Sequence, residues 1–154
     1  SILKELKYSR GIGIDISAEA IKIAKQNSER LNLNYKLKFL KFDLNKYNIG
    51  KYDLIVSNPP YIPKRDIKNL SKDIIRYEPI KALDGGIDGL DLIKKVIYKS
   101  SSLLKKNGLL ALEIGFNQYR MVSKILKNNG FREINKEYDN NKLNDYSTST
   151  VQVQ

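Results

Sequence analysis

The chain has 154 residues, 41% hydrophobic and 29% charged, a composition that is typical of one globular domain and excludes disordered or fibrous classes. It contains no cysteine and no histidine, which excludes disulfides, thiol nucleophiles and most transition-metal sites. No apolar run approaches the roughly 20 residues of a membrane-spanning helix, and Lys4, Glu5 and Lys7 interrupt any signal-peptide core, so we expect a cytoplasmic protein.

The first residues, 2–8, have the pattern of a helix end, and residues 11–16 form a short apolar strand. Ser17 suits the N-cap of the helix that follows. The other expected strands are residues 37–42, 52–56 and 109–114. The other expected helices run from Leu90 to a stop near Asn107-Gly108, and from Met121 to Asn129-Gly130. Residues 131–138 and 147–154 are expected to form a closing hairpin.

Repeated strand–helix units predict a mostly parallel sheet with helices on both faces. The stretch from Ile62 to Gly89 interrupts this pattern, because it has mixed polarity and two prolines. We expect a long loop with one short helix there. A loop of that length in a compact domain is usually functional.

The net charge of +11 has two explanations. A basic surface is typical of proteins that bind nucleic acid. The alternative is a lysine-rich composition that follows from the base composition of the source genome. The lysines are spread along the chain instead of forming one block, which favours the second explanation. Direct nucleic-acid binding is therefore not expected, whereas association with the ribosome is compatible with both explanations.

The tetrapeptide Asn58-Pro59-Pro60-Tyr61 directly follows the apolar run Leu54-Ile55-Val56. The Asn58 side-chain oxygen and the Pro59 carbonyl are two acceptors that can hold both N–H groups of a planar nitrogen. Neither proline has an N–H and both have a fixed φ, so the turn is stiff and its carbonyls stay available. Tyr61 can lie over a flat amide or base. This arrangement suits methylation of a conjugated nitrogen; the alternative is a proline-rich strand exit without function.

Carboxylates lie at or just after the ends of two of the expected strands, at Asp15 and Asp43. In doubly wound sheets, ligands bind beyond the carboxyl ends of the strands. Asp15 is therefore predicted to accept hydrogen bonds from ribose hydroxyls. Asp43 is predicted to read the exocyclic amine of adenine, with Phe42 or Leu44 against the ring. For each aspartate the alternative is a structural role in a turn or helix cap.

Two other features have weaker functional claims. Gly11 and Gly13 begin a strand, whereas the glycines of a dinucleotide-binding loop lie between a strand and a helix, so we reject a phosphate loop here. Glu113 ends the strand at residues 109–114. It is a candidate to orient substrate, and a structural carboxylate is the favoured alternative.

Taken together, these residues resemble the HemK-type glutamine methyltransferases, which methylate the glutamine side-chain amide in the Gly-Gly-Gln loop of peptide chain release factors. The resemblance covers nearly the whole chain. Its motifs are Asp15-Ile16-Ser17 with Ala20, Ala24 and Asn27, then Asp43, Asn58-Pro59-Pro60-Tyr61-Ile62, Tyr77-Glu78-Pro79, Ala82-Leu83, Gly85-Gly86, Asp88-Gly89-Leu90, Leu112-Glu113-Ile114-Gly115 and Gln118. The Asn-Pro-Pro-Tyr element is shared with DNA adenine methyltransferases, whereas the block from Tyr77 to Leu90 is more specific to the protein-glutamine group.

The resemblance implies a Rossmann-like class I α/β methyltransferase sheet with a C-terminal antiparallel hairpin, and one catalytic domain over residues 1–154. It implies the cofactor S-adenosylmethionine, no metal, and a peptide chain release factor as the partner. The implied cofactor-binding residues are Asp15, Ile16, Asp43, Leu44 and Asn58. The implied catalytic residues are Asn58, Pro59 and Tyr61, which bind substrate together with Pro60. Family members carry a further strand, a glycine loop and a small N-terminal helical domain that this chain does not contain, so we expect an N-terminally truncated domain.

Three alternative functions follow from the same residues. Without the glycine loop, the chain is a candidate for a non-catalytic remnant that binds a partner but not the methyl donor. A related enzyme that methylates a large-subunit ribosomal protein has the same block from Tyr77 to Leu90, so a ribosomal-protein glutamine is an alternative substrate. The third alternative substrate is DNA adenine, which the positive charge favours. The block from Tyr77 to Leu90 and the lack of a target-recognition region argue against DNA as the substrate.

Overall fold

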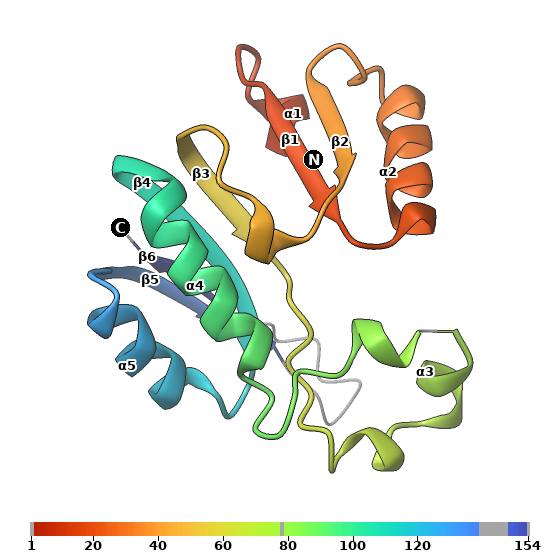
Figure 1. Cartoon of the computed structure of the whole chain (residues 1–154), viewed down its shortest axis with the longest axis vertical. Coiled ribbons are helices and arrows are strands. Elements are labelled where there is room, and N and C mark those ends of the chain that lie inside the picture. Colours follow the sequence, from red (N-terminus) through yellow and green to blue (C-terminus); the bar gives the residue numbers. More distant parts are fainter. Residues whose placement is uncertain (1, 78, 139–147, 154) are drawn as a thin grey trace. The chain divides into compact units, whose positions relative to one another are not determined.

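The computed structural model describes residues 2–77, 79–138 and 148–153. The chain divides into two compact units, Ser1–Asn48 and Ile49–Gln154, and each is considered by itself (Figure 1). In the described part of the chain, no helix is long and apolar enough to cross a membrane.

The first unit is a two-stranded parallel sheet with a helix between its strands. Its elements are α1 (Ile2–Glu5), β1 (Gly11–Asp15), α2 (Ala18–Arg30), β2 (Leu37–Lys41) and the short 3-10 helix η1 (Leu44–Lys46). The predicted N-cap is confirmed, because the Ser17 hydroxyl accepts a hydrogen bond of 3.1 Å from the Ala20 N–H. Ile21, Leu33 and Tyr47 are the buried apolar residues of this unit.

Gly13 lies within β1, as the rejection of a phosphate loop requires. A Cβ at this position would lie 2.7 Å from the ring of Phe39 on β2. Glycine is therefore needed here for side-chain packing on the sheet, and not for binding phosphate.

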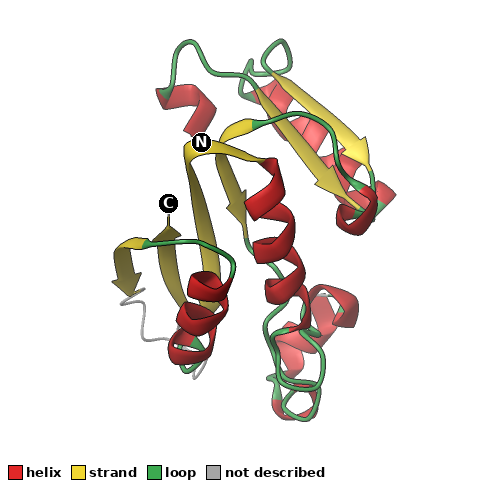
Figure 2. Ribbon diagram, turned by 60° about the vertical axis from the view of Figure 1, so that its left-hand side comes forward, coloured by secondary structure: helices red, strands yellow, loops and turns green. Residues whose placement is uncertain are grey.

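The second unit is a four-stranded sheet in the order β3-β4-β6-β5. Its main elements are β3 (Tyr52–Ser57), α4 (Asp91–Leu103), β4 (Leu104–Gly115), α5 (Tyr119–Asn128), β5 (Glu133–Tyr138) and β6 (Thr148–Val153). Figures 1 and 2 show α4 and α5 on the same face of this sheet. The most deeply buried apolar side chains come from these two helices and β4: Ile93, Ile97, Leu110, Leu112, Ile114 and Val122.

The predicted parallel pairing is confirmed within each unit, because β1–β2 and β3–β4 are both parallel pairs. Among the described residues of the second unit, β6 lies between β4 and β5 and is antiparallel to both, and β3–β4 is the one parallel pairing. The alternation of strands and helices in the sequence does not predict the position of β6, because it does not specify which strands the last strand pairs with. Residues 139–147, which include Ser147 of the expected hairpin, lie outside the described residues.

The end of α4 also differs from the prediction. The helix ends at Leu103, and Leu104 is already extended, with φ −75° and ψ 147°. Leu104 pairs with Tyr52, and the pairing between β3 and β4 then shifts register before Leu109. Asn107, with φ 64°, lies in this irregular stretch. The Asn107-Gly108 signal therefore marks a bulge within β4 and not the end of a helix.

Residues 62–89 form an irregular segment, as predicted. Its described residues contain three short helical turns instead of one: η2 (Ile67–Asn69), α3 (Lys72–Tyr77) and η3 (Ile80–Ala82). The segment folds back on its own start. The Ile62 N–H donates to the Leu83 carbonyl at 3.1 Å, and the Gly85 N–H donates to the Ile62 carbonyl at 2.9 Å. This pairing places Ala82 and Leu83 beside the residues that follow β3.

Candidate functional site

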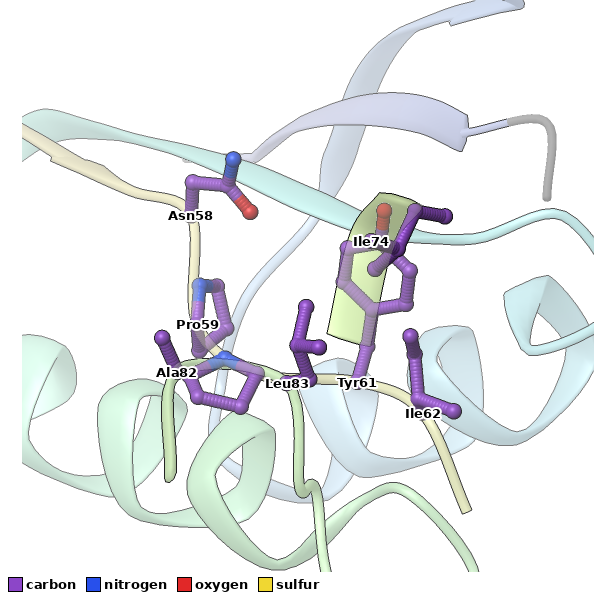
Figure 3. Close-up of a pocket in the computed structure, with 8 residues that line it drawn as sticks. Asn58, Pro59, Tyr61, Ile62, Ile74, Ala82 and Leu83 are labelled. Atoms are coloured by element: carbon purple, nitrogen blue, oxygen red, sulfur yellow. The ribbon is translucent and has the colours of Figure 1, made fainter. Parts of the chain in front are cut away.

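The tetrapeptide after β3 forms one wall of a pocket of about 330 Å³. The lining residues are Asn58, Pro59, Pro60, Tyr61, Ile62, Ile74, Ala82 and Leu83. Figure 3 shows the Asn58 amide and the Tyr61 ring projecting from the two ends of the tetrapeptide toward a shared space. The structure thus brings together the four residues that were predicted to bind the substrate. Apolar residues of the 62–89 segment also line the pocket.

Among the described residues, none forms a hydrogen bond with the two predicted acceptors of this pocket, the Asn58 side chain and the Pro59 carbonyl. Asn58 is exposed, whereas Pro59 is buried. An exposed amide beside a carbonyl on a stiff, proline-containing turn can accept two N–H groups from one planar ligand.

Tyr61 is held at both its main chain and its ring. Its carbonyl accepts a hydrogen bond of 2.8 Å from the Gln118 side-chain amide. Its ring lies so close to Gly115 that a Cβ there would be 3.3 Å from Tyr61 Cδ2. Burial, and then the negative charge of Glu113, raise the pKa of the Tyr61 hydroxyl above its ordinary value. Tyr61 is therefore a neutral, fixed aromatic wall at physiological pH.

Replacing Glu113 by glutamine is expected to lower the pKa of Tyr61 while leaving it above its ordinary value of about 10, because burial, the larger cause, remains. NMR titration of ¹³C-labelled tyrosine rings measures this pKa directly. Because the raised pKa belongs to the folded state, the stability that this group contributes is present below pH about 10 and is lost as the pH rises through the folded value.

A matched control is Glu133→Gln, which removes a carboxylate that hydrogen-bonds Tyr119 at 2.9 Å. This variant should leave the Tyr61 pKa unchanged. An identical Tyr61 pKa in the wild type and in Glu113→Gln would show that Glu113 does not act on the pocket.

The predicted cofactor residues of the first unit lie at the carboxyl ends of its two parallel strands. Asp15 ends β1, and Asp43 follows β2. One oxygen of each carboxylate has a turn role: Asp15 Oδ1 accepts from the Ser17 N–H at 2.7 Å, and Asp43 Oδ1 accepts from the Asn45 N–H at 2.8 Å. A structural role in a turn thus accounts for the Oδ1 atoms of Asp15 and Asp43. Their Oδ2 atoms have no protein hydrogen bond among the described residues.

Two apolar side chains lie next to these carboxylates in the chain. Ile16 is 67% exposed. Leu44 is partly buried at the start of η1. The predicted cofactor set therefore falls into two groups: Asp15, Ile16, Asp43 and Leu44 belong to the first unit, and Asn58 belongs to the second.

Three pocket residues and one residue beside the pocket were not predicted from the sequence to act there. Ala82, Leu83 and Gln118 belong to motifs of the resemblance, but the motifs do not reveal that the first two line the pocket or that Gln118 bonds Tyr61. Ile74 has no signal at all, since it is one apolar residue in a short helix of mixed polarity.

Comparison with known proteins identifies the family. The family model described as "Methyltransferase domain" matches residues 3–146. The chain belongs to this methyltransferase family. The fold agrees: a ribosomal protein L11 methylase from Lactobacillus delbrueckii subsp. bulgaricus superposes with a TM-score of 0.63 at 20% identity, covering 93% of this chain and 56% of that one. The predicted α/β methyltransferase fold is confirmed at this level.

The resemblance to glutamine methyltransferases is also confirmed. A release factor glutamine methyltransferase from Clostridium acetobutylicum is 42% identical over 139 residues, which are 86% of this chain and 49% of that protein. A ribosomal protein uL3 glutamine methyltransferase from Francisella tularensis is 38% identical over 110 residues, which are 71% of this chain and 35% of that protein. This methyltransferase chain thus spans about half of the first relative's length and about a third of the second's.

Proposed function

We propose that this chain is the catalytic part of an S-adenosylmethionine-dependent methyltransferase that acts on the glutamine side-chain amide in the Gly-Gly-Gln motif of peptide chain release factors. The observation that carries the proposal is the pair of available acceptors, Asn58 and Pro59, at the wall of a pocket that also contains Tyr61. Identity of 42% to a release factor glutamine methyltransferase supports the choice of substrate. In this proposal residues 1–154 act as one catalytic domain.

The pocket residues have distinct tasks in this reaction. A primary amide offers two N–H donors in one plane, and the Asn58 side-chain oxygen and the Pro59 carbonyl accept one each. Accepting both hydrogen bonds orients the nitrogen and increases the electron density on an atom whose lone pair is otherwise delocalised. Tyr61 packs on the flat face of the amide, while Leu83 and Ile74 contact the aliphatic part of the glutamine side chain. Positioning of this kind supplies a large part of the rate in direct group transfer.

The residues of the first unit fit the cofactor. Carboxylate oxygens that have no protein partner, at the carboxyl ends of parallel strands, suit the hydroxyl and amine donors of adenosine. Asp15 would bind the ribose hydroxyls and Asp43 the adenine amine, with Ile16 and Leu44 providing apolar contacts to the base. When bound, S-adenosylmethionine supplies an electrophilic methyl group. The protein residues bind and orient, and the proposed reaction needs no metal.

Binding of short peptides tests the acceptor pocket separately from the cofactor. We expect a peptide containing Gly-Gly-Gln to produce saturable NMR shifts of the Asn58 side-chain amide and of Tyr61 in the ¹⁵N-labelled chain. The control peptide contains Gly-Gly-Glu, which has the same length but offers no N–H donors to Asn58 and Pro59, so its binding should be at least roughly tenfold weaker. Equal binding of both peptides, or no shift with either, would contradict the proposed role of the pocket.

A ribosomal-protein glutamine is the second candidate substrate, because of the 38% identity to a uL3 glutamine methyltransferase. The acceptor chemistry is the same, so the pocket alone does not distinguish the two substrates. Adding release factor and uL3 together to the enzyme, and locating the methyl groups by mass spectrometry, separates them. Our proposal predicts that the release factor is methylated faster.

A further inference from the structure

Gln118 is a buried polar residue outside the pocket whose side chain makes three hydrogen bonds. It is only 2% exposed. Its Oε1 accepts from the Gly115 N–H at 2.9 Å, and its Nε2 donates to the Tyr61 carbonyl at 2.8 Å and to the Gly89 carbonyl at 3.2 Å. One acceptor and two donors are thus all used, as a buried amide requires.

These bonds join three segments that are far apart in the sequence. Tyr61 follows β3, Gly89 precedes α4, and Gly115 ends β4. Two of the three partners are glycines that the amide approaches closely. A Cβ at Gly89 would lie 2.6 Å from Gln118 Nε2, and a Cβ at Gly115 would lie 3.0 Å from Gln118 Oε1. The surrounding backbone is therefore built to admit this one side chain.

Gln118 anchors the pocket turn from outside it. Pro59 and Pro60 have no N–H and cannot hold the turn as donors, and the next N–H after the tetrapeptide, that of Ile62, donates to the Leu83 carbonyl. The Asn58 side chain and the Pro59 carbonyl have to stay available for a ligand. The Tyr61 carbonyl is the last main-chain acceptor of the tetrapeptide, and Gln118 is its donor. A hydrogen bond at this point holds the turn without using the groups that bind the substrate.

We propose that Gln118 is a positioning residue of the acceptor pocket, which fixes the orientation of the Pro59 carbonyl and of Tyr61 through its bonds to Tyr61 and Gly89. The effect of Gln118 on catalysis rests on the proposed function. Its effect on the conformation of the turn does not. Glutamate at this position would lose both donors and place a charge among carbonyl oxygens. Methionine would keep the approximate volume and lose all three hydrogen bonds.

The test compares Gln118→Met with Val122→Ala. Val122 is fully buried one turn later on α5, so its truncation destabilises the same region without removing a bond to the turn. In Gln118→Met we expect the Tyr61 N–H order parameter to fall from about 0.85 to below about 0.6, and the affinity for the Gly-Gly-Gln peptide to fall at least roughly tenfold. Val122→Ala should change neither quantity by a comparable amount.

The outcomes separate the two proposals. A Tyr61 that is as rigid in Gln118→Met as in the wild type overturns the positioning role, and so does an equal loss of rigidity in Val122→Ala. If Tyr61 becomes more mobile only in Gln118→Met, the positioning role is supported. If the wild-type chain also fails to bind the glutamine peptide, the proposed function is overturned while the positioning role stands. If Gln118→Met does not fold, hydrogen exchange of the wild-type Gln118 side-chain amide decides: slow exchange supports the three bonds, and exchange at the rate of an exposed amide overturns them.

Discussion

Asn58→Ala should lower the rate of glutamine methylation by roughly 100-fold or more, because it removes one of the two acceptors that orient the amide nitrogen. Cofactor affinity and stability should change little. The Asn58 side chain is exposed and has no hydrogen bond among the described residues, so its loss should alter the free energy of unfolding by no more than about 0.5 kcal/mol. The measurement is kcat for methyl transfer to release factor, with S-adenosylmethionine affinity determined by calorimetry.

A suitable control is Asn69→Ala, which truncates another exposed asparagine of the second unit outside the pocket. It should retain the wild-type rate. If Asn58→Ala also retains the wild-type rate, Asn58 has no part in the mechanism. If it lost activity only by unfolding, the available amide would be a structural group, and the assignment of its role would be wrong.

Gly89→Ala is expected to destabilise the second unit by about 3 kcal/mol. Gly89 has a φ of +76°, which L residues rarely adopt. An added Cβ would also meet the Tyr61 carbonyl and Gln118 Nε2, and so would break the hydrogen bonds that hold the pocket turn. The free energy of unfolding in urea measures this effect.

The chain contains a matched control for this variant. Gly130 has a similar φ of +84°, but a Cβ there would meet no atom within 4 Å. Gly130→Ala therefore carries the backbone strain alone and should cost about 1 kcal/mol. The difference between the two variants isolates the contacts of the added Cβ with Tyr61, Gln118 and Pro63. Equal destabilisation by the two variants would mean that the close approach at Gly89 has no energetic consequence.

Local signals predicted much of this structure because they depend on neighbouring residues only. Ser17 before a helical pattern is an N-cap, and the structure confirms it. The apolar runs before Asp15, before Asp43 and before Asn58 are strands, and the side chains that follow them lie at the strand ends. The lack of N–H donors at Pro59 and Pro60 was also predictable, because proline removes donors and fixes φ whatever the fold. The role of the Asn-Pro-Pro-Tyr turn in methylation stays a prediction.

The remaining features depend on contacts between distant segments. The position of β6 between β4 and β5 is a matter of strand pairing, on which hydrophobic periodicity is silent. Leu104 fits a helical pattern, but its pairing with Tyr52 places it in a strand. The hydrogen bond from Gln118 to Tyr61 joins residues 57 positions apart. A glutamine in isolation has no feature that reveals such a partner.

The most direct test of the central claim is tandem mass spectrometry of a release factor incubated with this chain and S-adenosylmethionine. The proposal predicts one added methyl group, located on the side-chain nitrogen of the glutamine in Gly-Gly-Gln, and its disappearance in Asn58→Ala. A methyl group on another residue, or on adenine in DNA, with that glutamine unmodified, would contradict the assignment of the acceptor pocket.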